Sequence, residues 1–381
     1  MTNKKLHVMF LGLRGIPCIQ GGIETHVENL AHRLVSLDCD VTVVGRKPYA
    51  INNNEISNST WKKVQLVNLW SPSSKGLEAI LHTFIGVLYA SFKRPDILHI
   101  HAIGPGILTP LARLLGLKVV VTHHGADYER QKWGAFAKYI LKTGEKFAAK
   151  YANQVISISN VITDSLAKLY SCQCVQIPNG VNNPDKSEQE TSEKPEVLDN
   201  FNIEPGKYII QVSRIVPEKR QIDLVKAFLE LNTDWKLAIV GSSDHPDVYT
   251  REVETYGKEN SNIVLTGFQS GQDLNDLFTN AGIFVLPSSH EGLPIALLEA
   301  LSYGLPSIAS NIPANLEVEL DDKHYFNLGD TRALSKKLNE FINTDFTQKM
   351  KHEIQQWTLD KYNWNDIAQK TKRVYDNEVS S

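Results

Sequence analysis

The chain has 381 residues and a formal net charge of −3, which is too long for one ordinary hydrophobic core and suits two domains of about 150–200 residues each. Apolar residues (42%) and charged residues (22%) occur at the frequencies of folded globular proteins, which excludes disordered, collagen-like and coiled-coil classes. None of the four cysteines lies near a second Cys or His pair at zinc-ligand spacing, so a reducing, cytoplasmic compartment is expected.

The charge is distributed unevenly along the chain. Residues 1–181 carry 20 Lys and Arg against 11 Asp and Glu, a balance of +9, whereas residues 182–381 carry 20 against 32, a balance of −12. This asymmetry indicates either a difference in composition between two domains that has no function, or a basic surface on the first domain that binds an anionic partner.

Short apolar runs alternate with helical periodicity along the whole chain, which is the pattern of βα repeats in parallel sheets. The first run, residues 6–13, is too short for a signal peptide and contains His7, so it is predicted to be a strand. The helix after it is amphipathic, with one polar face and one apolar face. The polar face comprises Glu24, Glu28 and Arg33, and the apolar face comprises Ile23, Val27, Leu30, Ala31, Leu34 and Leu37. Further strands are predicted at residues 40–46, 63–69, 96–101, 117–122, 153–158 and 174–177.

The longest apolar stretch, residues 77–92, is interrupted by Glu78 and His82. It falls short of the ~20 apolar residues that a bilayer span requires, so no membrane span is predicted.

Residues 182–207 are rich in Ser, Glu, Gln, Lys and Pro, the composition of a linker. A second alternation follows, with strands predicted at residues 208–213, 236–241, 263–267, 283–287 and 306–310. The final helix, residues 362–381, has an apolar face with large aromatic side chains that needs a partner. It either ends the second domain or packs back on the first, and we expect the second arrangement. The predicted domains are residues 1–181 with helix 362–381, and residues 208–361.

Two glycine-bearing turns lie at predicted strand-to-helix junctions, where free N–H groups and the helix dipole favour a phosphate. The first includes Gly12, Gly15, Gly21 and Gly22. It lacks both the closely spaced glycines of the dinucleotide fingerprint and the Gly-Lys-Ser/Thr ending of a P-loop. The sequence of this segment is compatible with a plain tight turn and with a phosphate-binding loop.

The second junction, residues 287–300, is more specific. Pro294 suits the first turn of a helix, and Gly292 lets a ligand approach the backbone closely. Glu291 is therefore predicted in the loop at the carboxyl end of a strand, and Glu299 about a turn and a half into the helix. Ionised carboxylates accept hydrogen bonds from sugar or ribose hydroxyls. Helix capping and surface charge would explain Glu291. They would not explain the carboxylate of Glu299 within an otherwise apolar helix.

Arg214 and Lys219 follow the end of another predicted strand. An Arg and a Lys five residues apart in a turn can converge on one anionic group, the first as a bidentate fork and the second as a point charge. A solvated loop is the alternative.

His123 and His124 lie at the carboxyl end of the strand predicted at 117–122. Successive side chains of a strand point to opposite faces, so we expect His124 to face the ligand and His123 to pack away from it. His99 and His101 supply further imidazoles, but no carboxylate is clearly spaced with them for a zinc site. No metal is expected.

Taken together and in this order, the motifs are similar to those of retaining glycosyltransferases of the GT-B fold, in glycosyltransferase family four. The strongest element is the Glu-x7-Glu pattern from Glu291 to Glu299, within Pro-Ser-x-x-Glu-Gly-Leu-Pro. The supporting motifs are Gly21-Gly22-Ile23-Glu24, His124-Gly125-Ala126-Asp127, Pro178-Asn179-Gly180-Val181, Arg214 with Lys219, Leu265-Thr266-Gly267-Phe268 and the last helix with Trp364.

The resemblance implies an α/β protein of two Rossmann-like, doubly wound parallel-sheet domains that face each other across a cleft. It implies that Arg214 and Lys219 neutralise the diphosphate of a nucleotide-sugar without a metal or other cofactor. Glu299 would hold the ribose hydroxyls and Glu291 the sugar hydroxyls. The remaining donor-binding residues implied on the second domain are Gly292, Leu293 and Phe268, with backbone groups near Phe268 holding the base.

On the first domain, the resemblance assigns His124 to the sugar and to the charge that develops at its anomeric carbon. Gly21 and Gly22 would let a loop approach the phosphates, while Glu24 and Asp127 would contact the acceptor or support the loops. The implied reaction is retaining transfer to a glycan or lipid-linked acceptor, in the assembly of a bacterial surface polysaccharide. No nucleic acid partner is expected.

Two departures from the family pattern lie beside this site: Arg220 and Ser213 stand where many relatives have Gly. Neither removes a required charge. Three alternatives are kept: a nucleotide-sugar epimerase of the same fold, a catalytically silent sugar-nucleotide-binding partner protein, and a nicotinamide oxidoreductase, which the missing fingerprint disfavours.

A lysine stripe adds an expectation about location. Its members recur at roughly four-residue steps on a predicted helix and are Lys132, Lys138, Lys142, Lys146 and Lys150. Such a stripe either keeps the domain solvated or binds an anionic leaflet. The expected location is therefore the cytoplasm, with peripheral binding to the inner face of the cell membrane as the hypothesis that the stripe raises.

Overall fold

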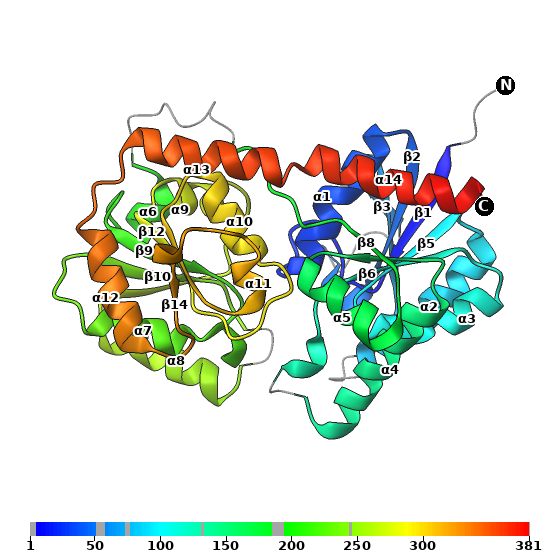
Figure 1. Ribbon diagram of the computed structural model, residues 1–381, viewed down its shortest axis with the longest axis horizontal. Helices are drawn as coiled ribbons and strands as arrows, with labels where there is room; N and C mark the ends of the chain where they lie inside the picture. Colours follow the sequence, from blue (N-terminus) through cyan, green and yellow to red (C-terminus); the bar gives the residue numbers. More distant parts are fainter. Residues whose placement is uncertain are drawn as a thin grey trace. The chain divides into compact units, whose positions relative to one another are not determined.

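The computed structural model describes residues 5–50, 58–72, 77–130, 133–184, 194–243 and 246–380. Figure 1 labels its α-helices and most of its strands. The chain divides into two compact units, one of Met1–Gly180 with Trp364–Ser381 and one of Val181–Asn363. We call them unit 1 and unit 2. Among the described residues, no helix combines the length and the hydropathy that a membrane span requires.

Unit 1 is built on an eight-stranded sheet of order β3-β4-β2-β1-β5-β6-β7-β8. Its strands are β1 Leu6–Leu11, β2 Cys39–Arg46, β3 Asn58–Trp61, β4 Val64–Leu69, β5 Ile97–His101, β6 Val119–His123, β7 Gln154–Ser157 and β8 Cys174–Gln176. Its α-helices are α1 Gly22–Ser36, α2 Leu77–Lys93, α3 Thr109–Leu114, α4 Ala135–Tyr151, α5 Asn160–Tyr170 and α14 Trp364–Ser380. Short 3-10 helices are η1 Lys47–Tyr49, η2 Pro105–Leu108 and η3 Asp127–Glu129.

Both faces of this sheet are covered by helices because both alternating sets of strand side chains are apolar. Val8 and Phe10 of β1 pack in one cluster with the buried faces of α1 and α14. Met9 and Leu11 pack in a second cluster with residues of α2, α3 and α4. The last helix of the chain therefore lies beside the first, as the blue and red ribbons of Figure 1 show.

Unit 2 is built on a six-stranded sheet of order β11-β10-β9-β12-β13-β14. Its strands are β9 Tyr208–Val212, β10 Lys236–Val240, β11 Ile263–Gly267, β12 Ile283–Leu286, β13 Ser307–Ser310 and β14 Tyr325–Phe326. Its α-helices are α6 Glu196–Asn200, α7 Gln221–Leu229, α8 Val248–Glu259, α9 Gly271–Thr279, α10 Ile295–Ser302, α11 Pro313–Leu316, α12 Thr331–Ile342 and α13 Gln348–Lys361. Its 3-10 helices include η5 Pro217–Lys219 and η6 Asp322–His324.

The α/β class is confirmed, because within the described residues every strand pairing is parallel apart from that of β3 with β4. Strands β3 and β14 were not predicted from the sequence. The first forms an antiparallel hairpin on the sheet edge, and its turn holds Lys62 and Lys63 at positive φ without a glycine to signal it. The second has only two residues.

Two segments differ from the sequence-based description. The segment of linker composition includes helix α6, in which Val197 and Leu198 are buried, so part of it belongs to the body of unit 2. On α1, Glu24 was placed on the polar face but is buried at 5% exposure. Its carboxylate serves a loop in unit 1, as described below.

Candidate functional site

The order of the strands marks where a ligand is expected on unit 2. The chain begins this sheet at β9, adds β10 and β11 on one side, and then places β12 on the other side. Ligands of open α/β sheets bind beyond the carboxyl ends of the strands at such a switch point. The loops that follow β9 and β12 carry Arg214, Lys219 and Glu291, so topology brings these residues to the same edge of the sheet.

Lys219 and Glu291 contact each other directly. The Lys219 Nζ lies 2.5 Å from Glu291 Oε1, and both side chains are largely buried. The two loops are also tied through their backbones, because Ser289 N donates to the carbonyl of Glu218 over 2.8 Å. A cation and a carboxylate held at a sheet switch point suit a ligand that has both an anionic group and hydroxyls.

Buried glutamines hold the β9 loop in place. Gln221 Nε2 donates to the Arg214 carbonyl over 2.9 Å and to Ser213 Oγ over 3.0 Å, while Gln211 Nε2 donates to the Lys219 carbonyl over 2.9 Å. Arg220 sits at φ 53°, in the left-handed region. That conformation favours glycine, so a Gly would fit this position without strain, as the family resemblance implies.

Glu299 lies in α10, which begins directly after Pro294. Its carboxylate has no hydrogen-bond partner among the described residues, and burial raises the pKa of Glu299 to about 7. Because desolvation disfavours the charged form, a ligand that donates hydrogen bonds to this carboxylate would restore its lost solvation. Of its neighbours, Leu293 is buried and Gly292 is partly exposed.

Phe268 follows β11 at the far edge of the same sheet and is 40% exposed. It lies beyond Gly267, which has a positive φ of 71°. The structure records no contact that joins Phe268 to the pair of Lys219 and Glu291.

The first glycine-bearing turn, in unit 1, is organised by Glu24. Its Oε1 accepts hydrogen bonds from Arg14 N over 3.0 Å and from Arg14 Nε over 3.3 Å. Arg14 Nη2 also donates to the Gln20 carbonyl over 2.9 Å. A Cβ at Gly21 would lie 2.1 Å from Glu24 Oε2, so a larger residue there would displace the carboxylate that holds Arg14. Gly22 opens α1 and is exposed. Glu24 therefore supports the loop.

The adjacent histidines have different partners. His123 is buried, and its Nε2 lies 2.8 Å from Glu145 Oε1 of α4. His124 is partly exposed, and its Nε2 lies 2.9 Å from His101 Nδ1 of β5. Alternation along the strand accounts for this divergence. Burial lowers the pKa of His124 well below its ordinary value, so its imidazole is neutral at pH 7.

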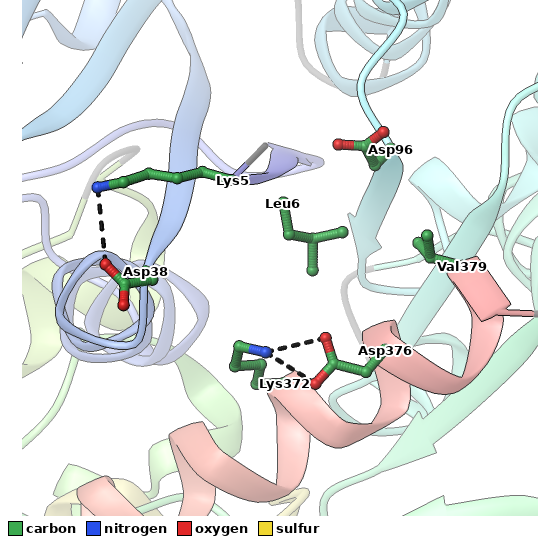
Figure 2. Close-up of a pocket in the computed structure, with 7 residues that line it drawn as sticks. All are labelled: Lys5, Leu6, Asp38, Asp96, Lys372, Asp376 and Val379. Atoms are coloured by element: carbon green, nitrogen blue, oxygen red, sulfur yellow. Dashed lines mark hydrogen bonds and ion pairs between the residues drawn. The ribbon is translucent and has the colours of Figure 1, made fainter. Parts of the chain in front are cut away.

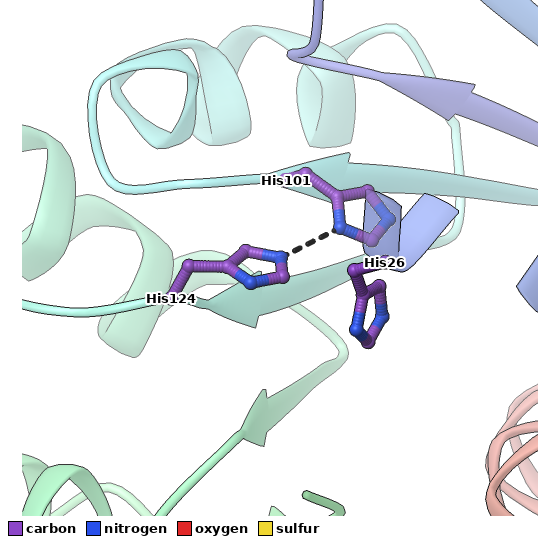
Figure 3. A group of neighbouring side chains, drawn as sticks. All are labelled: His26, His101 and His124. Atoms are coloured by element: carbon purple, nitrogen blue, oxygen red, sulfur yellow. Dashed lines mark hydrogen bonds between the residues drawn. The ribbon is translucent and has the colours of Figure 1, made fainter. Parts of the chain in front are cut away.

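Three imidazoles gather at the carboxyl edge of the unit 1 sheet (Figure 3). They are His26 of α1, His101 of β5 and His124 after β6. The Nδ1 of His26 lies 2.9 Å from Asn179 Oδ1. Sequence reasoning named His101 and His124 but passed over His26, because nothing in the spacing of residues 26, 101 and 124 shows that they meet.

Asp127 begins η3 and pairs with Arg130, whose Nη2 lies 2.8 Å from Asp127 Oδ1. This carboxylate therefore has a local partner. The expectation that it supports a loop agrees with that contact, whereas contact with an acceptor stays a prediction.

A pocket of about 550 Å³ lies at the opposite, amino edge of the unit 1 sheet (Figure 2). Its lysines already face carboxylates: Lys5 Nζ lies 3.7 Å from Asp38 Oδ1, and Lys372 Nζ lies 2.7 Å from Asp376 Oδ2. Because ligands of such sheets bind at the carboxyl ends, we do not assign the donor to this pocket.

Comparison with known proteins identifies the family of the chain. The model of the Glycosyltransferase Family 4 matches residues 20–183, and the model of the Glycosyl transferases group 1 matches residues 193–357. A UDP-Gal:alpha-D-GlcNAc-diphosphoundecaprenol alpha-1,3-galactosyltransferase of Escherichia coli is 31% identical over 245 residues, 60% of this chain and 61% of that protein. The match thus spans less than two thirds of that relative. An uncharacterized glycosyltransferase of Methanocaldococcus jannaschii is 23% identical over 93% of this chain and 94% of its own.

Solved structures show the same fold. A sucrose-phosphate synthase from Thermosynechococcus elongatus has a TM-score of 0.82 at 18% identity, covering 98% of this chain and 99% of its own. The Anabaena protein HepE in complex with UDP-glucose has a TM-score of 0.78 at 16% identity, covering 98% and 100%. With the two family models covering most of the sequence, the chain belongs to the group 1, or family 4, glycosyltransferases of the GT-B fold.

Proposed function

We propose that this protein transfers a sugar from a UDP-sugar to a lipid-linked glycan, with retention of the anomeric configuration, in the assembly of a surface polysaccharide. The observation that carries the proposal is the pair of Lys219 and Glu291 at the switch point of the unit 2 sheet. The names of the E. coli relative and of the HepE complex support the choice of uridine diphosphate and of a diphospholipid acceptor.

The proposed chemistry follows from the charges at this edge. Lys219 turns from Glu291 to the diphosphate, joined by Arg214, and together they stabilise the charge of the departing nucleotide. Glu291 is then released to accept hydrogen bonds from the donor sugar, and Glu299 accepts them from the ribose. Backbone groups near Phe268 bind the base, and Gly292 leaves room for the donor beside the loop.

His124 of unit 1 contacts the donor sugar as a neutral imidazole in this proposal. Neutrality matters because a cation beside the anomeric carbon would oppose the positive charge that develops there in the transition state. The Gly21-Gly22 turn, held by Glu24, keeps its backbone N–H groups available to phosphate.

A panel of UDP-, GDP- and dTDP-sugars tests the donor assignment by thermal shift and by release of nucleotide. A UDP-sugar at 100 times its dissociation constant should add about 2.7 kcal/mol to the stability of the folded state. Stabilisation by GDP- or dTDP-sugars alone would overturn the choice of base. Release of a free epimerised sugar, with or without acceptor, would favour an epimerase instead.

We also propose that α4 docks unit 1 on an anionic bilayer, where a lipid-linked acceptor resides. Lys142, Lys146 and Lys150 are exposed on the face opposite the buried Gly144 and Ala148. Exposed aromatic side chains extend this face at the start of the helix, with Phe136 at 76% and Tyr139 at 69%. Lys132, predicted as part of the same stripe, lies outside the described residues.

Lysines beside exposed aromatic rings suit a bilayer surface, because each Lys near anionic lipid contributes about 1 kcal/mol and the rings insert among headgroups. Sedimentation with anionic vesicles at low salt should carry the protein down, and the double substitution Lys142→Glu with Lys146→Glu should release it. The matched double substitution Lys226→Glu with Lys336→Glu, on exposed sites of unit 2, should not. Equal recovery of all three proteins in the supernatant would contradict the proposal.

A further inference from the structure

The imidazoles of His26, His101 and His124 form a cluster without a carboxylate. One nitrogen from each ring lies within 4.8 Å of the others, and the ring centroids are separated by 4.9, 5.2 and 5.6 Å. Three imidazoles bound to one tetrahedral zinc ion, at ordinary Zn–N distances, have ring centroids about 5 Å apart. The spacing of this cluster therefore matches that of a three-histidine metal site after small side-chain rotations.

The state of the rings suits metal binding. Burial lowers the pKa of His26 to about 4. Burial, with a smaller effect of neighbouring histidines that include His99, lowers the pKa values of His101 and His124 well below their ordinary range. All three are neutral at pH 7, and neutral imidazole is the commonest metal ligand. His101 is fully buried, with Nδ1 toward His124; its Nε2, which has no hydrogen-bond partner among the described residues, would carry the proton of the neutral ring.

His26 already has a second-shell partner. The Asn179 Oδ1 lies 2.9 Å from His26 Nδ1, and an amide oxygen can only accept, so His26 carries its proton on Nδ1 and leaves a lone pair on Nε2. Metal-binding histidines characteristically donate their other N–H to such a partner. His101 Nδ1 and His124 Nε2, 2.9 Å apart, lie close to the ~3.3 Å between two nitrogens on one tetrahedral zinc ion.

We propose that His26, His101 and His124 bind one transition-metal ion of the zinc class, with the fourth position open on the side of the partly exposed His124. Imidazole nitrogens prefer such ions to magnesium or calcium. The sequence-based expectation of no metal did not take into account that His26 lies beside His101 and His124. The consequence rests on the proposed function: an ion bound to His124 withdraws this imidazole from the donor sugar, so the metal inhibits the enzyme, which needs none for transfer.

Binding is measured without reference to activity. The intact protein is titrated with Zn²⁺ against a chromogenic chelator and with Co²⁺ by its visible absorption, which reports tetrahedral coordination. We expect one ion per chain. His26→Gln and His101→Gln should each weaken binding at least tenfold. The control His32→Gln removes a histidine of α1 outside the cluster, which bonds to the Glu28 carbonyl, and should bind as the wild type does.

Circular dichroism establishes that each variant is folded. Asn179→Ala removes the second-shell acceptor of His26 and leaves the three histidines in place. It should weaken binding by about tenfold or more, so the test does not depend on a variant that loses a ligand. No stoichiometric binding by the wild type, or equal affinity in the His26, His101 and His32 variants, would overturn the proposal.

Inhibition separates the metal site from the proposed function. Zn²⁺ should inhibit donor turnover with the concentration dependence of binding, and His26→Gln should raise the inhibitory concentration in parallel. Binding without inhibition would leave the metal site standing and remove His124 from the catalytic proposal. Loss of activity in His124→Ala, together with no metal binding by the wild type, would support the catalytic role of His124 and overturn the metal site.

Discussion

Glu299→Gln should stabilise the free protein while weakening its binding to donor. The carboxylate of Glu299 has no hydrogen-bond partner among the described residues, and burial raises its pKa from 4.5 to about 7. A neutral amide of nearly the same shape removes the cost of burying a charge. It also replaces an oxygen that accepts hydrogen bonds from ribose hydroxyls by an NH₂ group that cannot.

The size and the sign of the change in stability follow from proton linkage. Between pH 4.5 and about 7 the folded protein keeps the proton of Glu299 while the unfolded chain releases it, so this group's contribution to stability is complete below pH 4.5 and is lost as pH rises to about 7. A shift of one unit corresponds to about 1.4 kcal/mol. Glu299→Gln should therefore gain about 2–3 kcal/mol in free energy of unfolding, relative to the wild type, when pH is raised from 5 to 8.

Urea unfolding of both proteins at pH 5 and pH 8, followed by circular dichroism, measures this difference, and the titrations of other groups cancel in the comparison. Nucleotide affinity is measured by calorimetry at pH 8, where the substitution should weaken it about tenfold or more, the value of a hydrogen bond to a charged group. A stability difference that does not change with pH would refute the burial argument. Unchanged affinity would remove Glu299 from the donor site.

Arg214→Ala and Lys219→Ala should each lower kcat/KM by ~2–4 kcal/mol of transition-state stabilisation while the fold survives, and near wild-type turnover in both would sink the phosphate assignment. His124→Ala should abolish most activity with little change in unfolding temperature. His123→Ala should lower stability by about 1–2 kcal/mol, because it removes one of the partners of the buried Glu145, which keeps hydrogen bonds from Tyr128 and Tyr170; reversed phenotypes would exchange the two roles. EDTA should leave full activity, and strict dependence on added magnesium or manganese would contradict the proposal that side chains neutralise the diphosphate.

The strands and the α/β class could be predicted because each run of strand residues is short, apolar and followed by helical periodicity. The pattern does not extend to β3, which holds Asn58 and Ser59 on the sheet edge, nor to the two residues of β14. Such short or polar edge strands are defined by their pairing partner and not by their own composition.

The candidate site could be predicted as a set of residues but not as a set of contacts. Sequence reasoning placed Lys219 and Glu291 in loops, and the ion pair between them depends on β9 and β12 being neighbours in the sheet. It also placed Glu24 with the polar face of α1, because helical periodicity cannot show that a carboxylate turns back to hold Arg14. His26 escaped notice for the same reason: its partners are 75 and more residues away in the sequence.

We propose that this chain moves a sugar from a nucleotide donor to an acceptor with retention. This proposal is tested most directly by following UDP-[1-¹³C]galactose and UDP-[1-¹³C]glucose by NMR, in the presence of a polyprenyl-diphosphate-linked sugar. One of the two donors should be consumed, and its labelled anomeric carbon should appear in a glycosidic bond with the α configuration it had in the donor. A labelled product of the β configuration, or consumption of neither donor and of no GDP- or dTDP-sugar tested beside them, would contradict the account.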